Sequence, residues 1–372
     1  MTDVQRGPEI LPDTWEYRWV AAVVAKAAEY AGRPSNWNGE LYEQPGPISG
    51  VYERDGSMTV SRSHVLDPAR PAYTPGHSLT SDESQAAAGA TRILVFQARL
   101  SLTDRGDDTV PGATPIGSLE DLALEGGLAD QFARRYTTQI ADELAEQPLP
   151  TLAHPPAFPA YIAATDRLMY PLSGATGIGP DQLRDLIEST ERPQRFNEIA
   201  DRVIDHELGD LVPDAHRDEL RHELTGPLRR GLGHLTLVEA GQLTDPGTKH
   251  GQGDSTAELT TLEFQENLDD ILDHYESWAE QNPGAVPPRL PDSLLDTFRE
   301  RENEVRELWA AAGYAPDAQQ PAVRKAEITD LQRFLGSYTA TSRNGTPRYD
   351  PEPRADNVRP IGSARTPKRE VE

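Results

Sequence analysis

The stretch TSDESQAAAGATRILVFQARLSL (residues 80–102) provides the first indication of the fold of this chain. Thr80 and Glu83 stand three residues apart, a spacing that lets the hydroxyl of Thr80 and the carboxylate of Glu83 satisfy the first free amides of a helix. Mainly apolar residues follow to the end of the stretch. The pattern therefore predicts a long helix from about residue 80 to residue 102.

Elements of a small α+β unit are predicted on either side of this helix. Before it, a helix is expected over residues 14–31, and residues 51–61 are typical of a β-hairpin that turns at an Asp-Gly pair. After it, Ser118 predicts the start of a second long helix that ends near residue 144. This part of the sequence favours a small sheet combined with long helices.

The second half of the chain predicts a series of amphipathic helices. They are expected over residues 162–170, 180–189, 193–208, 214–238, 256–281, 291–312 and 321–335. Their apolar positions recur with a period near that of an α-helix, so each helix has one face to bury. The whole sequence thus predicts a predominantly α-helical α+β protein, in which a small β-sheet with long helices is followed by a helical bundle domain.

Length and proline content indicate how the chain divides. Its 372 residues exceed one ordinary hydrophobic core and fit two domains better. A run rich in proline near residue 150 marks the boundary. The expected parts are a disordered N-terminus at residues 1–12, an α+β domain at 13–146, a linker at 147–159, a helical domain at 160–337 and a disordered tail at 338–372.

The charge of the chain limits its partners. A formal net charge of -25 repels phosphate groups, so nucleic-acid binding is disfavoured. Most basic residues are arginines, a bias typical of a high-GC coding sequence such as those of actinobacteria or halophiles. Composition alone can produce this bias without any functional demand.

The absence of cysteine excludes disulfides, thiolate zinc sites, iron–sulfur clusters and cysteine nucleophiles. The first residues do not have the cationic and apolar regions of a signal peptide. No apolar run approaches the roughly 18 residues that span a bilayer. We therefore expect a cytoplasmic protein that does not associate with membranes.

Two segments, TRILVFQARLSLTD (residues 91–104) and LALEGGLAD (residues 122–130), together resemble the core of a zincin-type metallopeptidase. In that family one helix carries the motif His-Glu-x-x-His, and a later helix supplies a Glu ligand in a Glu-Gly-x-Ala-Glu-like context. The resemblance covers residues 80–145. It implies a zinc-binding ancestor whose glutamate activated a metal-bound water.

At the positions that match the motif, the groups that bind zinc are missing. Phe96 and Leu100 stand where the two histidines would be, and Gln97 replaces the base. The third-ligand position falls on Gly126, or on Glu125 if the alignment shifts by one residue. Because a catalytic zinc has three protein ligands, a single carboxylate does not hold it. The resemblance therefore implies a degenerate protein without metal, cofactor or catalytic residues.

A simpler interpretation of the same residues is structural. Phe96 and Leu100 then belong to the buried face of an ordinary helix, and Gly126 allows two helices to pack closely. Both interpretations predict that the protein does not hydrolyse substrates with zinc.

Two other groups of residues are candidates for binding. Lys249 and His250 lie in a glycine-rich segment (residues 245–255) that opens onto a helix N-terminus, where an anion can bind. The alternative is a flexible connector. Four histidines at positions 206, 216, 222 and 234 have acidic neighbours, but their spacing does not place them on one helix face, so solvated helix faces are expected.

The sequence favours a catalytically inactive, metallopeptidase-like protein with a binding or structural role, and a protein or peptide is a candidate partner. The alternative is an active hydrolase that uses an unrecognised carboxylate-based or metal-dependent site. The sequence does not identify a substrate, a partner or an oligomeric state.

Overall fold

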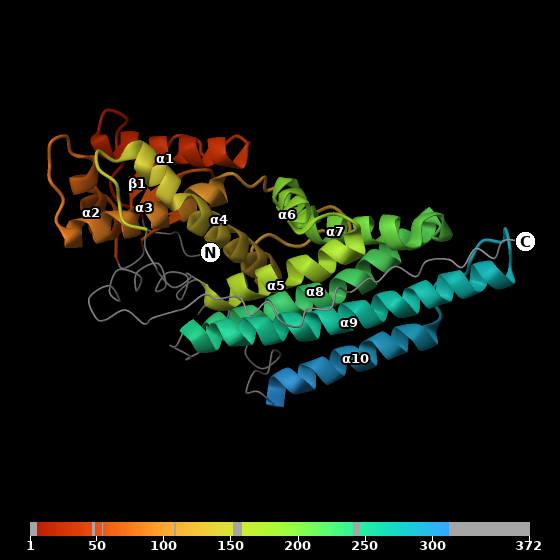
Figure 1. Ribbon diagram of the computed structural model, residues 1–372. Helices are drawn as coiled ribbons and strands as arrows, with labels where there is room; N and C mark the ends of the chain where they lie inside the picture. Colours follow the sequence, from red (N-terminus) through yellow and green to blue (C-terminus); the bar gives the residue numbers. More distant parts are fainter. Residues whose placement is uncertain are drawn as a thin grey trace, which may run out of the picture.

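The computed structural model describes residues 6–46, 49–53, 55–107, 109–151, 158–240 and 246–311. A small sheet and the first four helices form one end of an elongated molecule, and a bundle of longer helices extends from it (Figure 1). The predicted fold class, a predominantly helical α+β protein with a small sheet, is confirmed.

Three long helices support the sheet, and each begins at a polar cap. They are α1 (Trp15–Ala31), α3 (Ser81–Ser101) and α4 (Leu119–Leu144). Thr80 and Glu83 form the predicted capping box, in which the Thr80 amide donates to the Glu83 carboxylate at 2.9 Å and the Glu83 amide donates to the Thr80 hydroxyl at 3.3 Å. The hydroxyl of Ser118 likewise accepts from the amide of Asp121. Local capping chemistry thus fixes where these helices start.

The sheet has three short strands in the order β1-β3-β2. Strands β2 (Gly50–Tyr52) and β3 (Met58–Val60) pair in antiparallel fashion, which confirms the predicted hairpin. Strand β1 (Leu41–Glu43) pairs in parallel with β3 and was not predicted, because three residues are too few to show an alternating pattern. Short helical turns lead from β3 to α3: η1 (Arg62–Leu66), α2 (Asp67–Ala69) and η2 (Arg70–Tyr73).

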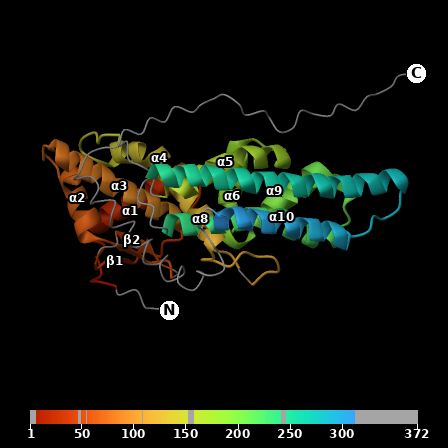
Figure 2. The same ribbon diagram turned by 90° about the horizontal axis from the view of Figure 1, so that it is seen from below.

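The second half of the chain is a helical bundle. Its longer elements are α5 (Pro159–Thr176), α6 (Pro180–Ser189), α7 (Arg195–Val203), α8 (Arg217–Ala240), α9 (Pro246–Gln281) and α10 (Asp292–Ala311). Short turns join them: η3 (Arg192–Gln194), η4 (Ile204–Leu208), η5 (Gly209–Leu211) and η6 (Asp214–His216). Helices α5, α8 and α9 lie side by side, and α10 packs along α9 (Figures 1 and 2).

One helix boundary differs clearly from the prediction. Helix α9 begins at Pro246, so the glycine-rich segment expected as a flexible connector is helical. The reason is packing, because Gly253 lies against the backbone of Ala160 at the start of α5. Tertiary contact here outweighs the poor helix propensity of glycine.

Several predictions fall outside the described residues. These are the helix over residues 321–335, the tail at 338–372, the first five residues and, within the linker at 147–159, residues 152–157. Within the described part, one continuous cluster of buried apolar side chains extends from α1 to α10. The division into two domains stays a prediction. No described helix is long and apolar enough to cross a lipid bilayer.

A buried histidine makes the docking of α10 sensitive to acid. His234 on α8 stacks on Trp309 of α10 with ring centroids 4.3 Å apart and planes 5° from parallel. Burial lowers the pKa of His234 from 6.5 to about 4. The folded protein thus favours the neutral ring, whereas the unfolded chain takes up a proton near pH 6.5. This contribution to stability is complete above pH 6.5 and is lost as the pH falls toward 4.

We expect the free energy of unfolding to decrease over that pH range and His234→Phe to remove part of the decrease. Urea unfolding at a series of pH values measures it. His222→Gln serves as the control, because His222 is an exposed residue of the same helix. An identical pH profile for His234→Phe and the parent would contradict the prediction.

Candidate functional site

The carboxylate of Glu125 is buried at the centre of a group of charged side chains. Glu125 on α4 is enclosed by side chains from three parts of the chain. Its Oε1 accepts from the hydroxyl of Thr103 at 2.8 Å and lies 3.5 Å from Nη1 of Arg99. Its Oε2 accepts from Nη1 of Arg195, at the start of α7. Both carboxylate oxygens of Glu125 therefore have cationic partners.

Further ion pairs extend this arrangement in two directions. Nη2 of Arg99 lies 3.5 Å from Oε2 of Glu188, which also binds Nη2 of Arg33 at 2.9 Å. Arg33 additionally donates to the backbone carbonyl of Glu188. On the other side, Arg192 binds both oxygens of Asp121, at 3.0 and 2.5 Å. We call these residues the buried charge network: Arg33, Arg99, Arg192, Arg195, Asp121, Glu125 and Glu188.

The electrostatics of the network favour an ionised carboxylate. Burial alone would raise the pKa of Glu125, but Arg195, Arg99 and Arg192 outweigh it and hold the pKa well below its usual range. Burial also lowers the pKa of Arg195, and the neighbouring Arg99 adds to that effect while Glu125 opposes it. Removing the carboxylate would leave Arg195 buried without a carboxylate partner among the described residues, and Arg99 with Glu188 alone.

The network carries more positive than negative charge. It contains four guanidinium groups and three carboxylates, which leaves one positive charge in excess. Arg99 and Arg195 expose 0% and 1% of their side chains. On each of them Nε and Nη2 have no hydrogen-bond partner among the described residues. Donors of this kind are costly to leave unpaired.

The structure distinguishes between Glu125 and Gly126, the two residues that the sequence offered for the third-ligand position. The Glu125 carboxylate meets Thr103 and Arg99 at the C-terminal end of α3. Gly126 instead faces α5, because a Cβ atom there would lie 2.9 Å from the ring of Tyr161 and 3.6 Å from that of Phe158. Of these two residues, it is therefore Glu125 that lies against the motif-bearing end of α3.

The residues at the other motif positions are packed in the interior. The ring centroids of Phe96 and Phe158 are 5.9 Å apart, and Leu100 packs against the same hydrophobic core. Gln97 is buried beside Gly50 of the edge strand β2, where a Cβ atom would lie 2.4 Å from its Nε2. Neither amide atom of Gln97 has a hydrogen-bond partner among the described residues.

These residues do not fit a catalytic zinc. Phe96 and Leu100 offer no lone pair, and Glu125 is already bound to guanidinium groups and a hydroxyl. Throughout the described ranges, no three His, Asp or Glu side chains are grouped so that they could hold a metal ion.

The candidate residues of the glycine-rich segment lie elsewhere and have structural partners. Nζ of Lys249 donates to the carbonyl of Glu239 at 2.6 Å and lies 3.1 Å from its carboxylate, which also accepts from the amide of Ala160. His250 lies 3.3 Å from Asp254, one turn further along α9. Lys249 therefore joins α8, α9 and the start of α5.

The prediction that the histidines occupy solvated helix faces is wrong for two of them. His216 and His234 are buried. His216 is hydrogen-bonded to the hydroxyl of Tyr275 at 3.0 Å, and His234 stacks on Trp309. Aromatic partners on the neighbouring helices allow both rings to be buried.

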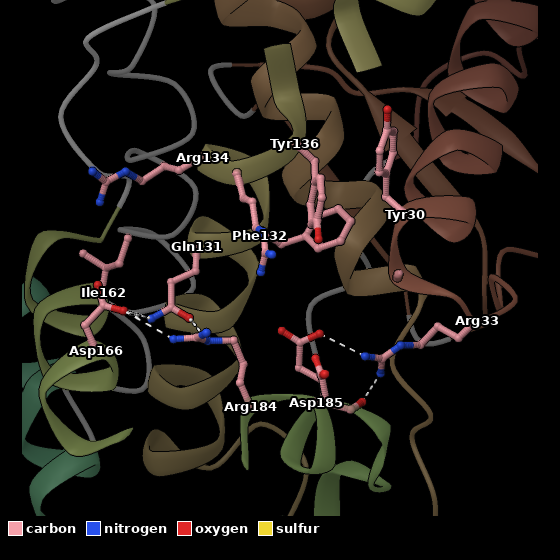
Figure 3. A pocket seen from close by; sticks show the side chains of 13 residues that line it. Tyr30, Arg33, Gln131, Phe132, Arg134, Tyr136, Ile162, Asp166, Arg184 and Asp185 are labelled. Atoms are coloured by element: carbon pink, nitrogen blue, oxygen red, sulfur yellow. Dashed lines mark hydrogen bonds and ion pairs between the residues drawn. The ribbon is translucent and has the colours of Figure 1, made fainter. Parts of the chain in front are cut away.

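A cleft opens beside the buried charge network, between α1, α4, α5 and α6 (Figure 3). Its volume is about 470 Å³. Aromatic side chains form one wall, where Tyr136 stacks with Tyr30 at a centroid distance of 5.0 Å and contacts Phe132 at 4.7 Å. Arg33 and Glu188 belong both to the cleft and to the network, so the cleft connects the charged interior with solvent.

Charged groups of both signs line the cleft. Figure 3 shows Arg184 turned toward Gln131 and Asp166, with its Nε 3.2 Å from Oε1 of Gln131. Nη2 of Arg184 lies 3.9 Å from Asp166. The guanidinium of Arg135 lies 5.3 Å from the ring centre of Tyr136. Burial raises the pKa of Asp166, although Arg184 opposes this.

Comparisons with known proteins identify no relative. No protein-family model, no curated protein and no solved structure matches this chain.

Sequence reasoning missed the arginines of the network and the cleft. One signal was present, since Arg99 is a charged residue in the mainly apolar end of the stretch that forms α3. A charged side chain in a buried stretch needs a partner, so Arg99 predicts an acidic residue on a neighbouring helix. The identity of that residue, Glu125, depends on the tertiary structure.

Proposed function

We propose that this protein is a non-catalytic binding protein derived from a zincin-like ancestor, in which arginines have replaced the metal ion as the counter-charge of the ancestral glutamate. The observation that carries the proposal is the environment of Glu125. Its carboxylate is bound by Arg99 and Arg195, while Phe96 and Leu100 occupy the positions that match the two histidines. A glutamate whose charge is neutralised in this way has a structural role and is not available to bind a metal ion.

The rival function, a hydrolase that uses carboxylates, has less support. Such an enzyme needs an acid and a base that both reach the substrate. In the cleft, Glu188 is bound by Arg33 and Asp166 lies beside Arg184, so two of the three lining carboxylates have cationic partners. The third lining carboxylate, Asp185, has no second unpaired carboxylate beside it among the described residues that line the cleft.

Zinc binding and hydrolysis test the proposal on the purified full chain. We expect calorimetric titration with zinc to show no stoichiometric site, and a panel of peptide and ester substrates to remain uncleaved with or without added zinc. One tightly bound zinc per chain, or hydrolysis that survives repeated purification, would contradict the proposed function.

A reconstructed variant tests the ancestry separately. Phe96→His, Gln97→Glu and Leu100→His together restore two imidazoles and a base, and Arg99→Gln and Arg195→Gln release the Glu125 carboxylate so that it can serve as the third ligand. Gly126 is left unchanged, because a larger side chain there would meet Tyr161. We expect zinc affinity to increase, with a loss of stability of roughly 1–3 kcal/mol for each polar group buried without a partner. A folded variant that binds zinc no better than the parent would remove the support for a metallopeptidase ancestry.

A further inference from the structure

We propose that the cleft between α1, α4, α5 and α6 binds a small aromatic carboxylate, that is, an organic anion with a carboxylate group on an aromatic ring. Arg33 and Arg135 are its cationic contacts. This inference does not rest on the absence of catalysis. A ligand could bind in this cleft whether or not the chain hydrolyses anything, so the two proposals fail on different measurements.

The first argument is the local charge. The whole chain has a net charge of -25, yet the described residues that line the cleft include four arginines and three acidic residues. Behind them the buried charge network also has one positive charge in excess. Burial lowers the pKa of Arg33 most, and the positive charge of the nearby Arg99 lowers it further, while Glu188 opposes both. An anion in the cleft relieves that repulsion.

The second argument is that the guanidinium of one arginine in the cleft is not neutralised by an acidic side chain of the described residues. Arg135 is exposed and makes no ion pair with any described residue. Its guanidinium lies 5.3 Å from the ring centre of Tyr136, an arrangement that holds the group by a cation–π contact. Because no carboxylate of the described residues pairs with Arg135, its N–H groups remain able to bind the carboxylate of a ligand.

Arg33 also lines the cleft and is held in place by fixed contacts. It donates to both the backbone carbonyl and the carboxylate of Glu188, as the dashed lines in Figure 3 show. Glu188 is itself shared with Arg99, whose buried Nη2 has no hydrogen-bond partner in the described part of the chain. Glu188 therefore does not fully compensate the two guanidinium groups beside it, and a second anion is favoured near Arg33.

The third argument concerns the body of the ligand. Phe132, Tyr136 and Tyr30 form a continuous aromatic wall, and Ile162 adds an apolar contact. A volume of about 470 Å³ falls in the range of roughly 300–1,000 Å³ that is typical of small-molecule sites. Flat aromatic groups pack on such a wall in offset or edge-to-face geometry. An aromatic carboxylate thus satisfies both the charge and the apolar surface.

Calorimetric titration of the full chain with benzoate tests the proposal, with benzamide as a neutral molecule of the same shape and inorganic phosphate as an anion without an aromatic body. We expect benzoate to bind and to raise the thermal unfolding temperature. Benzamide should bind at least about tenfold more weakly, because it lacks the charge-assisted contact. Phosphate should also bind at least about tenfold more weakly, because it lacks the aromatic ring that packs on the wall. The benzoate affinity should decrease as salt is added.

Substitutions locate the site. Arg135→Gln should weaken benzoate binding by about tenfold or more without changing the unfolding temperature of the free protein, because Arg135 makes no ion pair. Tyr136→Leu should weaken it through loss of the aromatic wall. Arg167→Gln is the matched control, since Arg167 is an exposed arginine on α5 that does not line the cleft.

Three results would overturn the inference. The first is that benzoate does not bind up to its solubility limit. The second is that benzoate and benzamide bind equally well, which would leave no role for the arginines. The third is that Arg167→Gln weakens binding as much as Arg135→Gln, which would reveal only a general effect of charge.

Discussion

Replacing Glu125 with Gln should lower the free energy of unfolding by about 3–5 kcal/mol, the usual effect of removing one partner from a buried ion pair. The substitution keeps the size of the side chain. Among the described residues, it removes the only carboxylate that binds Arg195 and one of two near Arg99. Both guanidinium groups are fully enclosed, so water cannot replace the missing charge. Urea unfolding of the variant and the parent measures the loss.

The same substitution should change the response to acid. The pKa of Glu125 in the folded protein lies below its ordinary value of 4.5, so its contribution to stability is complete above that pH and is lost as the pH falls below it. The Gln variant should therefore lose less stability than the parent between neutral pH and strongly acidic pH. Glu276→Gln, at an exposed position on α9, is the control and should behave like the parent. A Glu125→Gln variant as stable as that control would show that the network does not support the fold.

Replacing Gly253 with Ala should destabilise the protein by about 1–3 kcal/mol, even though alanine is the better helix former. A Cβ atom at this position would lie 2.3 Å from the carbonyl oxygen and 2.8 Å from the Cα atom of Ala160. These are backbone atoms at the start of α5, so relief requires the two helices to move apart. Thermal and urea unfolding measure the effect.

Gly251 provides the matched control for this prediction. It lies two residues earlier in the same helix, and no atom would come within 4 Å of an added Cβ. Gly251→Ala should therefore stabilise the protein by about 0.5–1 kcal/mol through helix propensity alone. A Gly253→Ala variant that gains stability as Gly251→Ala does would contradict the close packing of α5 and α9.

Local chemistry allowed much of the fold to be predicted. The starts of α3 and α4 follow from the caps at Thr80 and Ser118, and the hairpin follows from its Asp-Gly turn. The start of α9 was not predictable in this way, because Gly253 is helical through its contact with Ala160, a residue far away in the sequence. Long-range packing is the information that a local pattern does not contain.

The candidate site was less predictable for the same reason. The motif positions directed attention to Glu125, and the structure places that residue among charged side chains. Its partners lie 26 and 70 residues away along the chain, on α3 and at the start of α7. The cleft requires four helices to come together before Arg33 and Arg135 border the same space. No periodicity or spacing within one segment encodes that arrangement.

A double-mutant cycle between Glu125 and Arg195 tests most directly whether the carboxylate of Glu125 stabilises the fold. Unfolding free energies are measured for the parent, Glu125→Gln, Arg195→Gln and the double variant. Because the two side chains share a buried ion pair, each single variant should be strongly destabilised, and the double variant should lose less than the sum, with a coupling free energy of about 0.5–3 kcal/mol. Additive losses, or a Glu125→Gln variant as stable as the parent, would contradict the conclusion that arginines hold Glu125 in a structural role.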